Sequence, residues 1–308
     1  MDPALTSALL FPGQGAQAVG MGSALTERSP QAKEYFQQAS EVLGYDLLEL
    51  CLQGPGDKLS RTEFSQPALF VHSFAALKQL ESEQADLWEK VSCVAGLSLG
   101  EYTAVAAAGG MNFEDGVRLV QARGLAMQAA ADLVDSGMSS VIGMDLKKLE
   151  ELCNQATESD SDFVQPANLL CPGNIAVSGS IAAIERLEQL APEAGAMKTV
   201  RLQVAGAFHT AIMQPAVARL EAALAEITFS ELRVPVYSNV DAKPHSAGED
   251  FKSLLPQQVV SPVLWEASLR AVLETGIEEC IEVGTGKVLA GTLKRVQRKF
   301  PCSNYGDS

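Results

Sequence analysis

Short apolar runs alternate with longer segments of helical spacing along most of this chain. Apolar runs of about four to eight residues bounded by glycine, proline or polar clusters are typical of buried strands, whereas apolar positions three and four apart indicate amphipathic helices. Strands are predicted in this way over residues 7–11, 91–95, 234–238 and 280–283. Helices are predicted over residues 35–50, 67–80, 117–130, 211–225 and 264–274, with a last helix after Gly286. This alternation predicts an α/β fold with a parallel sheet.

The middle of the chain follows a different order. The pattern there predicts a strand, a helix, two strands, a helix and a strand, at residues 138–144, 146–156, 163–170, 174–178, 182–190 and 197–204. The order βαββαβ is that of the ferredoxin-like unit. We therefore expect a large domain of residues 1–132 and 205–308, interrupted by a ferredoxin-like small domain of residues 133–204. The clearest loop is the polar, acidic stretch 159–162.

The composition of the 308 residues narrows the class of protein. Hydrophobic residues make up 47% and charged residues 20%, as in globular α/β proteins. The net charge of −15 opposes nucleic acid and anionic membranes as partners, and no apolar run reaches the ~18 residues of a membrane helix. The start, Met1-Asp2-Pro3, resembles neither a signal nor a transit peptide. Six widely spaced cysteines without a C-x-x-C motif predict no metal site, no disulfide framework and a reducing compartment.

The segment Gly96-Leu97-Ser98-Leu99-Gly100 lies between the predicted strand at 91–95 and a small-residue segment with helical character. A G-x-S-x-G serine in a strand–turn–helix context is typical of a nucleophile, because the strained turn exposes its hydroxyl beside free N–H groups at a helix N-terminus. By residue pattern alone, the alternative is a buried structural serine in a tight turn.

A serine nucleophile needs a base, and the chain has three histidines. His72 lies in an apolar segment, as a core histidine would, and His245 lies in a polar stretch predicted to be an exposed turn. His209 follows a predicted strand and precedes a helix, where sites of parallel sheets assemble. We therefore expect His209 to be the base, the alternative being a structural histidine at a helix start. The carboxylates between Ser98 and His209 mostly fall on the inserted unit, so no acid can be singled out to orient the histidine.

Seven motifs in one order make the chain resemble the malonyl-CoA:acyl-carrier-protein transacylases from about Leu10 to Arg298. They are FPGQGAQ at residues 11–17, GLSLGEY at 96–102, RG at 123–124, FHT at 208–210, SNV at 238–240, QVVSPVLW at 258–265 and EVGTGKVL at 282–289. The resemblance implies an α/β-hydrolase-like large domain with a ferredoxin-like insert. It also implies malonyl-CoA and phosphopantetheinylated acyl carrier protein as substrates, with no bound cofactor or metal.

The resemblance assigns roles to residues around the serine. Ser98 would carry the malonyl ester, and His209 would act as general base and then general acid. Gln258 matches the residue whose main-chain carbonyl orients the histidine in place of a carboxylate. The backbone N–H groups of Gln14 and Leu99 would form the oxyanion hole. By pattern alone, residues 12–15 could equally be a plain turn after the first strand.

Two further residues would set the substrate. Arg123 matches the arginine that holds the free carboxylate of the malonyl group, because a guanidinium binds a carboxylate through two parallel N–H···O bonds. Without the family register, Arg123 resembles an ordinary surface charge on a helix. Phe208 matches the bulky residue of malonyl-selective members, where it would crowd an α-methyl group.

Leu97 departs from the family, many members of which carry histidine at this position. The leucine and the segment Cys171-Pro172-Gly173-Asn174 are similar to cyanobacterial and plastid members. We therefore expect the protein in the plastid stroma or in the cytoplasm of a bacterium or cyanobacterium.

A basic cluster at Lys294, Arg295, Arg298 and Lys299 is spaced to share one side of a helix. Since the family's carrier protein is acidic, we expect this cluster to dock it, with Lys198 and Arg201 extending the surface. A solvated helix face is the alternative.

The resemblance therefore predicts a transacylase with ping-pong kinetics in fatty acid biosynthesis. The alternatives are a serine hydrolase or thioesterase on the same scaffold, a polyketide-synthase-type malonyl transferase, and a non-catalytic docking module of a larger synthase.

Overall fold

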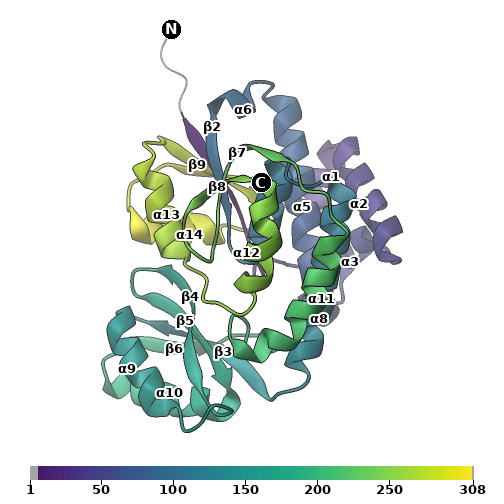
Figure 1. The fold of residues 1–308 in the computed structure, drawn as a ribbon. Coiled ribbons are helices and arrows are strands. Elements are labelled where there is room, and N and C mark those ends of the chain that lie inside the picture. The colour runs from purple at the N-terminus through teal and green to yellow at the C-terminus, as the bar shows by residue number, and fades with distance from the viewer. Residues whose placement is uncertain (1–5, 307–308) are drawn as a thin grey trace.

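The computed structural model describes residues 6–306, so the start of the chain, Met1 to Pro3, lies outside the described residues. A six-stranded sheet has the strand order β10-β9-β1-β2-β7-β8 (Figure 1). The pairs from β10 to β7 are parallel, and β8 is antiparallel to β7. The strands are β1 (Ser7–Phe11), β2 (Val91–Gly96), β7 (Glu231–Tyr237), β8 (Pro244–Ala247), β9 (Glu279–Gly284) and β10 (Cys302–Gly306).

Helices cover both faces of this large sheet. They are α1 (Ser23–Arg28), α2 (Pro30–Leu43), α3 (Leu47–Gln53), α4 (Gly56–Ser60), α5 (Thr62–Glu83), α6 (Leu87–Lys90), α7 (Leu99–Ala107), α8 (Phe113–Ala131), α11 (Gln214–Ala225), α12 (Phe251–Gln258), α13 (Trp265–Glu274) and α14 (Val288–Val296), with short 3₁₀ turns at Ala211–Met213 and Gly248–Asp250. Side chains of β1 alternate between the two faces. Leu9 and Phe11 join the larger core with α2, α5 and α8, whereas Ala8 and Leu10 pack in a second core with α13 and α14.

A second sheet of four antiparallel strands has the order β4-β5-β3-β6. Its elements are β3 (Ser136–Ile142), α9 (Leu146–Ala156), β4 (Val164–Cys171), β5 (Asn174–Ser180), α10 (Ile181–Glu193) and β6 (Lys198–Arg201). The order βαββαβ and the strand arrangement are those of the predicted ferredoxin-like unit. Figure 1 shows α9 and α10 side by side on this small sheet, below the large one. The domain limits at residues 132, 133, 204 and 205 stay a prediction.

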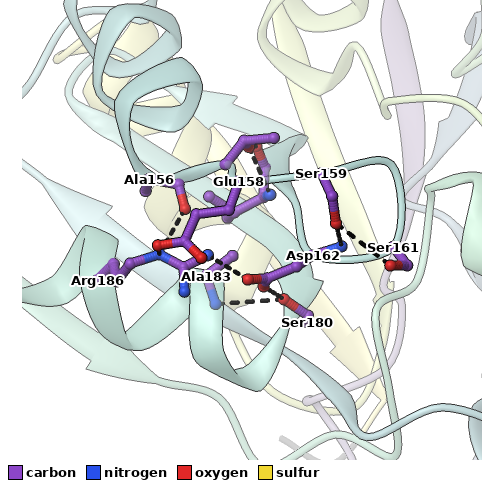
Figure 2. A network of polar contacts seen from close by, with 10 residues as sticks. Ala156, Glu158, Ser159, Ser161, Asp162, Ser180, Ala183 and Arg186 are labelled. Carbon is purple, nitrogen blue, oxygen red and sulfur yellow. Dashed lines mark hydrogen bonds and ion pairs between the residues drawn. The ribbon is translucent and has the colours of Figure 1, made fainter.

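The predicted loop at 159–162 is a tight turn held by polar contacts (Figure 2). Arg186 of α10 donates to Asp162 at 2.6 Å and to the Ala156 carbonyl at 2.8 Å. The Ser180 hydroxyl donates to Asp162 and accepts from the Ala183 N–H at 3.2 Å. The network ties the turn between α9 and β4 to the start of α10.

Two helix predictions were wrong in detail. The single helix expected over residues 35–50 is two helices, because Gly44 ends α2 in the left-handed region at φ 79° and the Asp46 side chain caps α3 by accepting from Glu49 N–H. The helix expected over 67–80 is α5, which is not amphipathic. All its residues from Ser65 to Leu77 are buried, since other helices cover it on several sides.

Several elements were missed and one was extended too far. The pattern gave no sign of the edge strands β8 and β10, of the eight-residue helix α12, or of the short helices α1, α4 and α6. His245, expected in an exposed turn, lies in β8 and contacts Asp241 and Asp250. The last helix, α14, ends at Val296, and its cap Gln297 is extended. Arg298 and Lys299 therefore lie beyond the helix, so the expected single helical side is wrong.

Candidate active site

The serine turn joins β2 to α7 at the carboxyl end of the parallel strands. Ser98 has φ 51°, a strained backbone conformation for a residue with a side chain. A Cβ on Gly96 would lie 2.0 Å from the Gly100 carbonyl carbon, and a Cβ on Gly100 would lie 2.1 Å from the Phe11 carbonyl oxygen. Both flanking glycines are therefore required by close backbone approach, as expected for a nucleophile-bearing turn.

His209 faces this serine from the segment between β6 and α11. Its Nε2 lies 2.9 Å from Ser98 Oγ. Its Nδ1 lies 2.8 Å from the Gln258 main-chain carbonyl, to which it donates if Nε2 is the acceptor for the serine. His209 has φ 63° and is only 2% exposed. No carboxylate among the described residues takes the orienting position, which a peptide carbonyl at the end of α12 occupies instead.

Arg123 reaches the same point from α8. It is 1% exposed, and its Nη2 donates to Ser98 Oγ at 3.1 Å and to Gln258 Oε1 at 3.0 Å. Its guanidinium carbon lies 4.9 Å from the centre of the Tyr102 ring. Neighbouring Arg118, in contrast, is exposed and pairs with Glu114 and Asp115. The structure thus distinguishes the buried arginine from the exposed surface arginine five residues before it.

Burial shapes the charges of this cluster. Burial, and then the nearby Arg123 charge, lower the pKa of His209 to about 4. Burial also lowers the pKa of the Arg123 guanidinium, which stays charged because its ordinary pKa is so high. The imidazole is therefore neutral near pH 7 and can accept a proton from Ser98.

Residues 8–304 match the acyl transferase domain family. The malonyl CoA-acyl carrier protein transacylase of Bacillus subtilis is 39% identical over 293 residues, which cover 95% of this chain and 91% of that protein. The chain belongs to the malonyl-CoA–acyl carrier protein transacylase family. An acyl-carrier-protein S-malonyltransferase structure from Bartonella henselae matches with a TM-score of 0.94 and 36% identity, covering 98% of this chain and 96% of that one. A type II polyketide malonyl-transacylase, solved in complex with its acyl-carrier protein, matches with a TM-score of 0.93 and 34% identity over 98% and 96% of the two chains.

The transacylase family's remaining sequence-predicted residues lie around the serine. Leu99 is the first residue of α7. Gln14 lies in the loop after β1, where Leu97 N–H donates to the Phe11 carbonyl at 3.0 Å and a Cβ on Gly13 would lie 2.3 Å from the Leu97 carbonyl oxygen. This contact brings the Gln14 loop against the serine turn. Phe208 is buried in the large core, next to His209.

Sequence reasoning missed two residues of the site. Glu101 accepts hydrogen bonds from Gln258 Nε2 and from Asn239 N–H, and the Asn239 side chain bonds both Gly96 and Ser98. Both residues belong to the motifs of the resemblance, but no role was predicted for them. A carboxylate within an otherwise apolar and small-residue helix was the available signal for Glu101.

The basic cluster, unlike these buried groups, lies on the surface. Lys198, Lys294, Arg295, Arg298 and Lys299 are exposed, and we call them the basic face. Arg201, expected to extend it, is instead paired with Glu188 at 3.0 and 2.8 Å. Within residues 6–306, no group of three or more His, Cys, Asp or Glu residues could hold a metal ion, and no helix is long and apolar enough to span a membrane.

Proposed function

We propose that this chain transfers the malonyl group of malonyl-CoA to the phosphopantetheine thiol of acyl carrier protein, through an ester on Ser98, in fatty acid biosynthesis. One observation carries the proposal: the Ser98 hydroxyl lies 2.9 Å from the His209 imidazole and 3.1 Å from the Arg123 guanidinium. A nucleophile, a neutral base and a buried cation therefore converge on one point.

The first half-reaction is an acyl transfer to the serine. His209 Nε2 takes the Ser98 proton as Oγ attacks the thioester carbonyl, and the tetrahedral intermediate's oxyanion accepts hydrogen bonds from Leu99 and Gln14 N–H. Each such donor is worth about 3–4 kcal/mol of barrier. The intermediate collapses as the C–S bond breaks, and His209 returns the proton to the leaving CoA sulfur. In the second half-reaction, His209 takes the proton of the carrier thiol as its sulfur attacks the ester carbonyl. The bond between that carbonyl carbon and Ser98 Oγ then breaks, and His209 returns the proton to the serine.

Arg123 supplies the preference for malonyl. Its hydrogen bonds in the structure are to the neutral groups Ser98 Oγ and Gln258 Oε1, so a malonyl carboxylate would give this buried cation an anionic partner. Acetyl-CoA offers no carboxylate. Phe208 beside the base supports exclusion of an α-methyl substituent.

The way His209 is oriented favours transfer over hydrolysis. A carbonyl, unlike the aspartate of a hydrolase triad, adds no full negative charge beside the imidazole, so water is activated less strongly. Incubation with malonyl-CoA alone separates the two activities. A burst of one CoA per enzyme with a stable ester supports the transacylase, whereas continuous CoA release would show a hydrolase or thioesterase.

The basic face is the proposed docking surface for the carrier. Arg295 donates to the Pro172 carbonyl at 3.0 Å, and Gly173 N-terminal to β5 accepts from Gly143 N–H at 2.8 Å. A Cβ on Gly143 would lie 2.4 Å from Met197 Cγ. Through these contacts, the end of α14 and the start of β6 both lie close to the turn between β4 and β5. Met197, just before β6, is 83% exposed there. Cations around an exposed apolar side chain suit an acidic protein partner, given this chain's net charge of −15.

Charge reversal tests this surface. Arg295→Glu/Arg298→Glu is expected to raise the carrier's KM several-fold at low salt, with malonyl-CoA acylation unchanged, and the effect should shrink as salt screens the charges. Lys33→Glu, an exposed lysine on α2, is the matched control. Unchanged carrier kinetics at low salt would remove the basic face from the docking surface.

We propose as location the plastid stroma or a bacterial or cyanobacterial cytoplasm. It rests on Leu97 and the segment 171–174 alone. The carrier's pathway is proposed to be fatty acid synthesis, and kinetics with a polyketide carrier in parallel would test that choice.

A further inference from the structure

Glu101 is a buried carboxylate beside the site that the reaction steps above do not use. It lies in the first turn of α7 and is 0% exposed. Its Oε2 accepts from Gln258 Nε2 at 2.5 Å and from Asn239 N–H at 3.2 Å. One oxygen atom thus receives hydrogen bonds from two residues that each hold part of the site.

The first of these residues, Gln258, is fixed on every side. Its Nε2 also donates to the Ser98 carbonyl at 2.9 Å, so both amide protons are used. The opposite amide atom, Oε1, must then face Arg123, from which it accepts at 3.0 Å. The main-chain carbonyl of the same residue contacts His209 Nδ1 at 2.8 Å. An acceptor at position 101 therefore fixes which way the amide faces Arg123 and where the carbonyl meets the base.

The second residue, Asn239, holds the nucleophile's backbone. Its Nδ2 donates to the Gly96 carbonyl at 2.8 Å, and its Oδ1 accepts from Ser98 N–H at 2.6 Å. These bonds bracket the serine whose φ of 51° is strained. Strained conformations persist where surrounding contacts over-determine them, and the Glu101–Asn239 bond adds one such contact.

Given the proposed function, we propose that Glu101 is a positioning residue. By accepting hydrogen bonds from Gln258 and Asn239, it fixes the positions of Arg123, His209 and Ser98 relative to one another. Its role is that of a hydrogen-bond acceptor. Burial raises the pKa of Glu101 to about 7, and the bonds from Gln258 and Asn239 require only an acceptor oxygen. Either protonation state leaves Oε2 able to accept.

Two substitutions at position 101 distinguish the loss of the hydrogen-bond acceptor from the loss of the negative charge. Glu101→Gln keeps an acceptor oxygen and has no charge at any pH, whereas Glu101→Leu fills the same volume without an acceptor. The readout is the ratio of Ser98 acylation rates with malonyl-CoA and acetyl-CoA, which does not depend on how much of the protein is folded. Misplacement of reacting groups by about 1 Å costs on the order of 100-fold.

We expect Glu101→Gln to keep the malonyl rate within about fivefold of wild type and to keep the ratio. Glu101→Leu should lower the malonyl rate about 100-fold and the ratio about tenfold, because Arg123 loses its alignment. Glu282→Leu is the matched control, since Glu282 is also 0% exposed and accepts from Leu289 and Ala290 N–H at 3.0 and 2.9 Å. It should weaken folding and leave the ratio unchanged.

A second readout needs no substrate and so stands apart from the proposed function. The chain has three histidines, and ¹⁵N NMR of their rings reports the His209 tautomer and its Nδ1–H bond. Wild type and Glu101→Gln should give the same His209 signals, and Glu101→Leu shifted ones. If wild type forms no malonyl ester, the proposed function fails while these signals still test the positioning.

The proposal is overturned if Glu101→Leu keeps the wild-type ratio and His209 signals, or if Glu101→Gln shifts them as far as Glu101→Leu does. Should Glu101→Leu not fold, Glu101→Gln alone decides: unchanged ratio and signals support acceptance, and changed ones contradict it.

Discussion

Two arginines, Arg123 in α8 and Arg186 in α10, differ in the partners that their guanidinium groups contact. Arg186 is partly exposed and pairs with Asp162 at 2.6 Å in the small-sheet network of Figure 2. Arg123 is 1% exposed and contacts a hydroxyl, an amide oxygen and an aromatic ring. Its Nε is buried without a hydrogen-bond partner. Of these two arginines, Arg123 is the more deeply buried, and within the described residues it forms no ion pair with a carboxylate.

Burying a cation is costly unless the charge is paired. In the small sheet the carboxylate is supplied by the chain, and the Ser180 hydroxyl and Arg186 hold the pKa of Asp162 below its usual range. At the serine, the buried cation contacts only neutral groups, and we propose that its anionic partner is the malonyl carboxylate. The comparison contrasts an arginine that holds a turn through an ion pair with one to which we assign substrate selection.

Arg123→Ala should have the largest effect of the arginine changes. Loss of a buried charge partner costs about 3–5 kcal/mol, so kcat/KM for malonyl-CoA should fall about 200- to 5,000-fold. The acetyl-CoA rate should fall much less. Arg123→Lys should recover only part of the loss, because an ammonium cannot form two parallel bonds. Steady-state kinetics with both thioesters measures this, and equal losses for the two would contradict the assigned role.

The pH dependence should show the cost of keeping His209 neutral. Its pKa falls from 6.5 in the unfolded chain to about 4 when folded, so between these values the unfolded chain binds more protons. His209 should therefore lower stability as pH falls through this window, by about 3 kcal/mol in all. Denaturant unfolding of wild type and His209→Gln between pH 4 and pH 7 isolates the effect.

The same pKa predicts the acylation profile. The rate with malonyl-CoA should stay flat down to about pH 5 and fall only as the imidazole gains a proton near pH 4. A midpoint near 6.5 would instead show an ordinary, solvated histidine.

Arg186→Ala should give the smallest effect. It breaks the contacts to Asp162 and Ala156, so the melting temperature should fall by a few degrees while malonyl kcat/KM changes less than about twofold. A large loss of activity would mean that the small-sheet network positions the site, and the contrast between the two arginines would fail.

The sequence predicted the α/β class, the βαββαβ order and the convergence of Ser98, His209 and Arg123. The family order of motifs was decisive for Arg123, because helical spacing alone does not distinguish it from Arg118. Local signals also failed where tertiary packing decides, because α5 is buried by helices from distant parts of the chain. The basic spacing that suggested a longer last helix did not show that Gln297 becomes extended and ends α14 at Val296.

The roles of Glu101 and Asn239 could not be predicted for a related reason. Each acts through hydrogen bonds to residues more than 130 positions away in the sequence. Their partners become known only when the start of α7, the segment after β7 and the end of α12 are brought together. The family motifs contain both residues, but only the structure shows which groups they contact.

Peptide-mapping mass spectrometry after incubation with malonyl-CoA tests the central claim most directly. A malonyl adduct on the peptide that contains Ser98, present in wild type and absent from Ser98→Ala, is the expected result. An adduct of equal yield in Ser98→Ala would contradict it.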